Sequence, residues 1–171
     1  MTTNSKTPHI FFITGTSGSG KSTLTTLLQE KLPTLNFAIH DFDEVGVPAE
    51  ANATWRQATT DYWLTKAVKN TEKRISTIIC GVIVPTEVIN SMVKPSNPIS
   101  FGFIHISNEL IIQRLQERQW SSQQIQDNIN WAHVLEKEVT LQKSHLIIDG
   151  SSKTPNDVAQ DFYQWIINFN P

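Results

Sequence analysis

A glycine-rich segment near the amino terminus, Gly15-Thr16-Ser17-Gly18-Ser19-Gly20-Lys21-Ser22, constrains the fold of this 171-residue chain more than any other feature. It matches the spacing G-x-x-x-x-G-K-[ST]. An apolar run at 10–13 precedes it and predicts a buried strand, and residues 22–32 follow it with leucines at helical spacing. The sequence therefore predicts the strand, loop and helix that a phosphate-binding P-loop requires.

The residue types in this loop suit a polyphosphate. Glycines and small side chains let backbone amides approach an anion, and the following helix adds partial positive charge at its amino terminus. Lys21 is expected to reach the β- and γ-phosphates, and the Ser22 hydroxyl to take one position on Mg²⁺. A Ser/Gly turn that only caps a helix is the alternative. The predicted nucleotide-binding residues are Gly15, Thr16, Ser17, Gly18, Ser19, Gly20, Lys21, Ser22 and Thr23.

Composition excludes several other classes of protein. The net charge of −2 offers no basic field for nucleic acid. Cys80 is the single cysteine, so neither a disulfide framework nor a cysteine metal cluster can form. No apolar span approaches the length of about 18 residues that a membrane helix needs, and residues 1–8 lack a signal-peptide core. We expect one domain over 1–171, cytoplasmic and without a membrane partner, and its oligomeric state stays open.

Apolar segments alternate with helical patterns along the chain. The expected strands are 10–13, 36–40, 76–84, 100–106 and 146–149, and the expected helices are 22–32, 54–74, 86–93, 108–118, 121–140 and 155–169. Continuous apolar runs are typical of strands buried on both faces of a parallel sheet. This order predicts a parallel α/β sandwich with helices on both faces and the ligand above the carboxyl ends of the strands.

Two carboxylates, Asp41 and Asp43, follow the second expected strand, which should end at the same sheet edge as the P-loop. Residues at i and i+2 point the same way from an extended backbone. One carboxylate could then hold Mg²⁺ while the other orients and deprotonates an attacking hydroxyl. Turn capping and solvation by Asp are the alternative.

A pair of arginines, Arg114 and Arg118, lies one helical turn apart before the short polar segment 119–122. This arrangement suits a small lid around 115–128, from which guanidinium groups could clamp the transferring phosphoryl oxygens. A solvated helix end is the alternative, because basic residues are favoured near helix carboxyl termini.

An aromatic stripe at helical spacing includes Trp55, Tyr62 and Trp63. Such a stripe indicates either a core face or an acceptor pocket, and both interpretations stay open. In the second, Arg56 binds an anionic group of the acceptor.

Together the P-loop, Asp41-x-Asp43, the paired arginines and the order of elements resemble the P-loop small-molecule kinases, which include nucleoside monophosphate, shikimate and gluconate kinases. The resemblance implies a three-layer sandwich with a five-stranded parallel sheet of order 2-3-1-4-5, ATP with Mg²⁺ and lid closure. It also implies that Asp41 lies near Mg²⁺, that Asp43 meets the acceptor hydroxyl and that Arg56 binds substrate. The loop at 149–155 matches the one that borders adenine.

The third expected strand departs from the pattern of many P-loop proteins, because Cys80 stands where a Walker-B aspartate is usual. Metal binding must then depend on Ser22 and Asp41. Gly81, the next residue, would let a substrate approach the strand end closely.

The predicted function is ATP-dependent transfer of the γ-phosphoryl group to a small hydroxylated or phosphorylated metabolite, with nucleosides and nucleotides among the candidates. Its predicted catalytic residues are Lys21, Asp43, Arg114 and Arg118, and its predicted substrate-binding residues are Asp43, Arg56 and Gly81. A regulatory ATPase or switch acting on a protein partner is the alternative, although no Walker-B acid is visible to assist it. A nucleotide-binding module without turnover is a third possibility.

Overall fold

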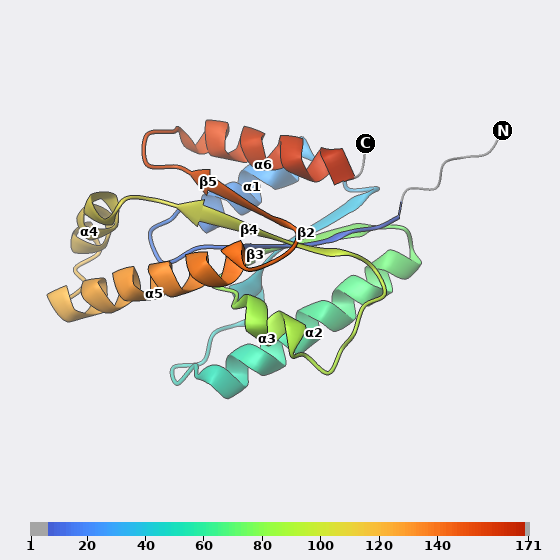
Figure 1. The fold of residues 1–171 in the computed structure, drawn as a ribbon, viewed down its shortest axis with the longest axis horizontal. Coiled ribbons are helices and arrows are strands. Elements are labelled where there is room, and N and C mark those ends of the chain that lie inside the picture. The colour runs from blue at the N-terminus through green and yellow to red at the C-terminus, as the bar shows by residue number, and fades with distance from the viewer. Residues whose placement is uncertain (1–6, 170–171) are drawn as a thin grey trace.

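The structure is a computed structural model that describes residues 7–169. Within that range the strands form one parallel sheet in the order β2-β3-β1-β4-β5, as the resemblance to P-loop small-molecule kinases implied (Figure 1). The strands are β1 Ile10–Thr14, β2 Phe37–Asp41, β3 Ser76–Gly81, β4 Ile99–His105 and β5 His145–Asp149. The helices are α1 Lys21–Lys31, the 3-10 helix η1 Phe42–Val45, α2 Ala53–Glu72, α3 Pro85–Ile89, α4 Asn108–Glu117, α5 Ser122–Thr140 and α6 Pro155–Phe169.

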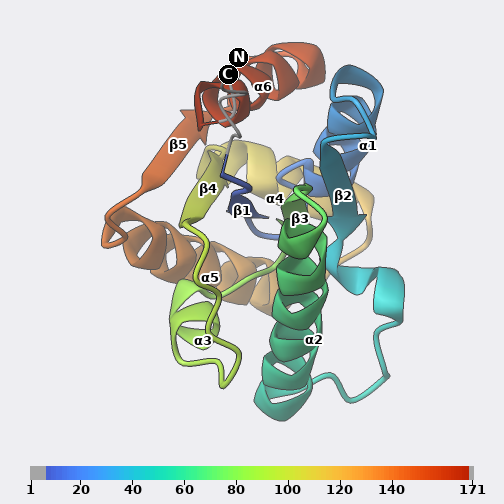
Figure 2. The same cartoon turned by 90° about the vertical axis from the view of Figure 1, so that its right-hand side faces the viewer.

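Helices cover both faces of the sheet, which makes three layers. In Figure 1, α1 and α6 lie above the sheet and α2, α3 and α5 lie below it, and Figure 2 shows the same layers from the side. Alternation along β1 explains the arrangement, because successive side chains of a strand point to opposite faces. Phe11 and Ile13 join the buried cluster that includes α1 and α6, whereas Ile10 and Phe12 join the cluster that includes α2 and α3.

Helix α5 contributes to both clusters. Ile125 and Ile129 in its amino-terminal half pack with the first, and Leu135 and Val139 in its carboxyl-terminal half pack with the second. Its amino terminus carries a capping box, in which Ser121 and Gln124 satisfy each other's backbone amides. This fixes the start of α5 within the segment 115–128 that was expected to form a lid.

Two elements end more than two residues before the sequence prediction. Strand β3 ends at Gly81 rather than at residue 84, because the chain leaves the sheet there and the Ile83 amide donates to Thr14 Oγ1 at 2.9 Å. Helix α3 begins at Pro85 and ends at Ile89, so it is shorter than the predicted 86–93. Apolar character alone could not locate either end, since the buried residues continue past the last strand residue.

Candidate active site

The P-loop connects β1 to α1 at the carboxyl edge of the sheet, as predicted. Gly20 is the residue before α1 and has φ 99°, a backbone conformation that residues with a Cβ rarely adopt. Lys21 opens the helix, and its Nζ donates to the Thr16 carbonyl at 2.7 Å. The ammonium group therefore lies over the loop, where it is expected to contact the bound phosphates.

The environment of Lys21 changes its acidity. Burial lowers the pKa of the Lys21 ammonium to about 8, although the negative charges of Asp43 and Asp41 act in the opposite direction. The amine is poorly solvated and faces two carboxylates. An anion bound in the loop would restore the preference for the charged form.

Two adjoining cavities flank the P-loop. The first, called the phosphate cleft here, has a volume of about 270 Å³ and is lined by Ser17, Gly18, Gly20, Lys21, Ser22, Thr23, Asp41, Asp43, Gly81, Val82 and Arg118. The second, called the side cavity, has a volume of about 240 Å³ and is lined by Gly18, Ser19, Gly20, Thr23, Leu24, Ile104, Ile106, Arg114, Arg118, Gly150, Lys153, Pro155 and Val158. The phosphate cleft thus brings together the loop, both predicted carboxylates and one of the two predicted arginines.

Asp41 and Ser22 lie next to each other in the phosphate cleft. The Ser22 hydroxyl is 3.4 Å from Asp41 Oδ2, which is the carboxylate of the last residue of β2. Within residues 7–169, no group of three or more His, Cys, Asp or Glu side chains is arranged to hold a metal ion. One hydroxyl and one carboxylate nevertheless fit Mg²⁺, because this ion usually takes few protein oxygens and completes its shell with waters and substrate phosphates.

Asp43 reaches the cleft by a different route from the one predicted. The backbone is not extended after Asp41, because residues 42–45 form the 3-10 helix η1 with Asp41 as its N-cap. Asp41 Oδ1 accepts the Asp43 amide at 2.9 Å, and the Asp41 amide donates to Glu44 Oε2 at 3.3 Å. The i, i+2 argument was therefore wrong about the backbone, although both carboxylates line the same cleft.

The Asp43 carboxyl is partly desolvated. Burial raises its pKa, the neighbouring Asp41 charge raises it further, and the Lys21 ammonium opposes both effects. Two carboxylates close together beside one ammonium are suited to different tasks, because the group with the raised pKa accepts a proton more readily.

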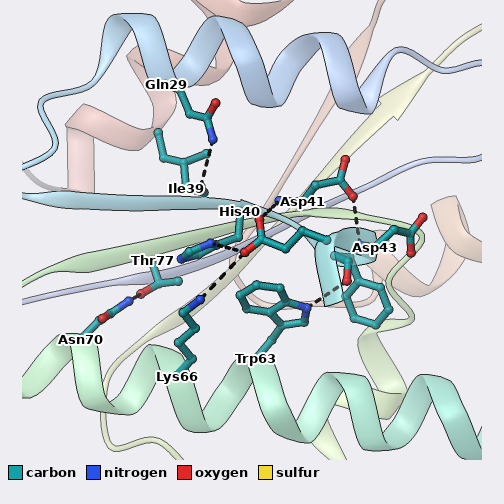
Figure 3. Close-up of polar contacts among 11 residues, drawn as sticks. Gln29, Ile39, His40, Asp41, Asp43, Trp63, Lys66, Asn70 and Thr77 are labelled. Atoms are coloured by element: carbon teal, nitrogen blue, oxygen red, sulfur yellow. Dashed lines mark hydrogen bonds and ion pairs between the residues drawn. The ribbon is translucent and has the colours of Figure 1, made fainter. Parts of the chain in front are cut away.

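The turn that carries Asp43 is held from α2. Trp63 is fully buried, and its indole N–H donates to the Phe42 carbonyl at 3.0 Å (Figure 3). His40 Nδ1 lies 2.9 Å from Glu44 Oε1, and Lys66 Nζ lies 3.9 Å from the same oxygen. Trp63 is thus a core residue rather than part of an acceptor pocket, whereas the side chain of its neighbour Tyr62 is 49% exposed.

Gly81 lines the cleft, and the structure gives a second reason for glycine there. A Cβ at this position would lie 2.2 Å from the Cβ of Phe42, so the space is taken by the side chain that anchors η1. We predicted that this glycine leaves room for a substrate. The structure shows that β3 packs closely there against η1, which carries Asp43 and Glu44 and is called the acidic turn here.

The two predicted arginines have different positions. Arg118 lines both cavities, whereas Arg114 lines only the side cavity and its Nη1 donates to the Gly18 carbonyl at 2.7 Å. Arg118 caps α4 and precedes Gln119, which has φ 61°. Of the pair, Arg118 is the one that lines the phosphate cleft together with Lys21 and Asp43.

Comparison with known proteins now adds to this geometry. A sequence model described as the AAA domain matches residues 11–136, which is more than half of the chain. The chain belongs to the AAA domain family. No curated protein gives a significant match to it.

Solved structures show that this AAA domain shares the fold of P-loop small-molecule kinases. A sugar kinase from Janibacter sp. HTCC2649 is 20% identical with a TM-score of 0.64, and each chain is covered to 94%. Shikimate kinase from Acinetobacter baumannii, in complex with shikimate, is 18% identical with a TM-score of 0.62, covering 94% of this chain and 93% of the other. The protein APE1195 is 17% identical with a TM-score of 0.71, covering 95% and 97%.

Arg56 of this AAA domain does not line either cavity. Its guanidinium donates twice to Glu87 Oε1, from Nε at 3.1 Å and from Nη2 at 2.8 Å, and lies 5.9 Å from the Trp131 ring centroid. This ion pair joins α2 to α3. The charge that we expected to meet an acceptor is matched by a carboxylate of the same chain.

Asn128 is a contact of the P-loop that the sequence analysis missed. Its Oδ1 accepts the Ser17 amide at 3.2 Å and its Nδ2 donates to the Ser17 carbonyl at 3.3 Å. The available signal was a polar residue directly beside the buried Ile125 and Ile129 on α5.

Among the described helices of the AAA domain, none has the length and apolar character needed to cross a membrane.

Proposed function

We propose that this AAA domain transfers the γ-phosphoryl group of ATP to a hydroxyl group of a small molecule. The observation that supports this most strongly is the lining of the phosphate cleft, which Asp43 shares with the P-loop lysine and Arg118. A carboxylate with a raised pKa, close to phosphate-binding groups, is suited to orient and deprotonate an acceptor.

The nucleotide would span both cavities. Its phosphates would lie on the P-loop amides with Lys21 beside them, and its base would enter the side cavity, which Gly150, Lys153 and Pro155 border. The two cavities share Gly18 and Arg118 among their lining residues, so one extended ligand can occupy both. Ser22 and Asp41 would hold Mg²⁺, which when bound neutralises charge on the phosphate oxygens.

The residues of the cleft divide the remaining work. Asp43 would accept the proton of the acceptor hydroxyl as its oxygen forms a bond to the γ-phosphorus. The bond from that phosphorus to the bridging oxygen of ADP breaks in the same step. Lys21 and Arg118 would stabilise the charge that develops on the transferring oxygens and on ADP. We also propose that residues 115–128, which carry Arg118, act as the lid of this site.

The test is ADP release measured across a panel of hydroxylated metabolites with the variant Asp43→Asn. We expect acceptor-dependent ADP release by the wild type and a loss of about 10²-fold in kcat in the variant, because a general base contributes on this order. The ATP dissociation constant should stay within about twofold, since the P-loop is unchanged.

The matched control is Glu72→Gln, which changes an exposed carboxylate at the carboxyl end of α2 that lines neither cavity. It should leave kcat unchanged. Wild-type turnover in Asp43→Asn would remove this residue from the mechanism. ADP release that depends on a protein partner and not on any small acceptor would indicate a switch instead.

A further inference from the structure

The crest of the P-loop, defined here as Ser17 and Gly18, is held from outside the loop by two helices. Arg114 of α4 donates to the Gly18 carbonyl at 2.7 Å. Asn128 of α5 bonds both the amide and the carbonyl of Ser17, at 3.2 and 3.3 Å. Because one amide side chain engages both backbone groups of Ser17, it fixes the two peptide planes that flank this residue.

The position of the crest matters for the cleft. Ser17 and Asp43 line the phosphate cleft and are absent from the lining of the side cavity, whereas Gly18, Gly20 and Thr23 line both. Gly18 therefore lies where the two cavities meet, and Ser17 lies in the part of the P-loop nearest Asp43. A phosphate that contacts this part is the terminal one, because the base side of the nucleotide lies in the opposite direction.

We propose that Asn128 is a positioning residue that sets the P-loop crest against the γ-phosphate. This inference rests on the proposed function. Asn128 acts through the Ser17 backbone. It orients the backbone of the crest, which contacts the phosphate, and does not itself react.

The docking of α5 does not require an amide at this position. Ile125 and Ile129 on the same side of the helix are buried and hold α5 against the sheet, and Asn128 is only partly buried beside them. A polar side chain at the border of an apolar stripe contributes little to packing. Its two bonds to one residue of the loop are its distinctive contribution.

This placement predicts that Asn128 distinguishes ATP from ADP. The rest of the loop contacts the phosphates that both nucleotides share, and Lys21 reaches the β- and γ-phosphates, whereas the crest contacts only the γ-phosphate, which ADP lacks. Removing the Asn128 amide should therefore weaken ATP binding and slow transfer, and it should leave ADP binding nearly unchanged. A side chain that only stabilised the fold would affect both nucleotides alike.

The experiment compares Asn128→Ala with the wild type by calorimetric titration of ATP and ADP with Mg²⁺, together with steady-state kinetics. We expect kcat to fall about tenfold and the ATP dissociation constant to rise about fivefold, on the scale of two lost hydrogen bonds. The ADP constant should change less than about twofold. Asn130→Ala is the matched control, because Asn130 is exposed on α5 and accepts only from Gln126 among the described residues.

Asn128→Asp provides a second variant in case the alanine variant is unstable. The carboxylate can still accept the Ser17 amide, but it cannot donate to the Ser17 carbonyl, and it places a negative charge near the γ-phosphate. We expect a larger loss of ATP affinity than in Asn128→Ala, again with a smaller effect on ADP.

The outcomes separate this inference from the proposed function. Equal losses for ATP and ADP, or no loss for either, would overturn the role of Asn128. A selective loss of ATP affinity without any acceptor-dependent turnover in the wild type would support Asn128 and contradict the kinase proposal. A wild type that binds neither nucleotide would overturn both.

Discussion

The two sides of the phosphate cleft are built by different means. On the P-loop side, the shape follows from a short run of sequence, and Lys21 contacts a carbonyl five residues earlier. On the acidic side, the position of Asp43 depends on elements far along the chain, since Phe42 packs against Gly81 and accepts the Trp63 N–H. The first side is mainly locally encoded, with Arg114 and Asn128 holding only its crest, and the second is tertiary, so mutations should affect them differently.

The largest expected effect is on the local side. Lys21→Met removes the ammonium group while keeping most of the apolar stem, and we expect turnover to fall about 10³-fold because the charge on the transferring phosphoryl group loses its fixed partner. Thermal unfolding should show no loss of stability, since burial disfavours the charged amine in the free protein. Retention of turnover within tenfold would show that Lys21 is not part of the site.

The tertiary side can be broken without touching a charged group. Gly81→Ala places a Cβ 2.2 Å from the Phe42 Cβ, which must move and take η1 and Asp43 with it. We expect about 2 kcal/mol lower stability from overpacking, together with at least a tenfold loss of kcat, while ATP affinity changes little.

The control for this variant is Gly102→Ala on β4, whose added Cβ would lie 2.6 Å from Phe162 Cε1, away from the acidic turn. Chemical denaturation and kinetics measured on both variants separate the two effects. If Gly81→Ala and Gly102→Ala lose kcat equally, the packing of Phe42 does not position Asp43.

The same distinction explains what could be predicted from the sequence. The P-loop, the alternation of strands and helices and the sheet order follow from local patterns and the stated resemblance, and the structure confirms them. The 3-10 conformation at Asp43 was missed by the extended-backbone argument, although turn capping by Asp was the stated alternative and Asp41 does cap η1.

Pairings across the chain were beyond local patterns. Arg56 and its partner Glu87 are 31 residues apart, and Asn128 and Ser17 are 111 residues apart. Helical spacing indicates which face of a helix is buried, but it does not indicate which backbone or side chain an exposed or half-buried polar group meets. The roles assigned to individual site residues therefore stay predictions.

A pH profile would sharpen the comparison, because each side contributes one limb. The pKa of the Lys21 ammonium is lowered to about 8, so its charge is present below that pH and is lost above it. The pKa of the Asp43 carboxyl is raised, so the base is lost as pH falls, at a higher pH than for an ordinary aspartate. We expect a bell-shaped profile of kcat/KM with an alkaline limb near pH 8.

Asp43→Asn identifies the limbs. It should abolish the acid limb in the residual activity and leave the alkaline limb in place, because the asparagine does not titrate. An acid limb that persists in this variant would assign that ionisation to another group. The comparison requires nucleotide and acceptor well below their KM values, where kcat/KM reports the free protein.

The smallest expected effect concerns Arg56, where the sequence prediction and the geometry point to different roles. Arg56→Ala should lower stability by about 1 kcal/mol, because it leaves the partly buried Glu87 carboxylate without its ion pair. The acceptor KM should change less than about twofold, since Arg56 lines neither cavity.

Glu87→Gln is the matched variant, because it weakens the same pair and leaves the guanidinium in place. A tenfold rise in acceptor KM in Arg56→Ala, with no rise in Glu87→Gln, would show that the arginine leaves Glu87 to bind the acceptor. The acceptor would then itself bring Arg56 to the acidic side of the cleft.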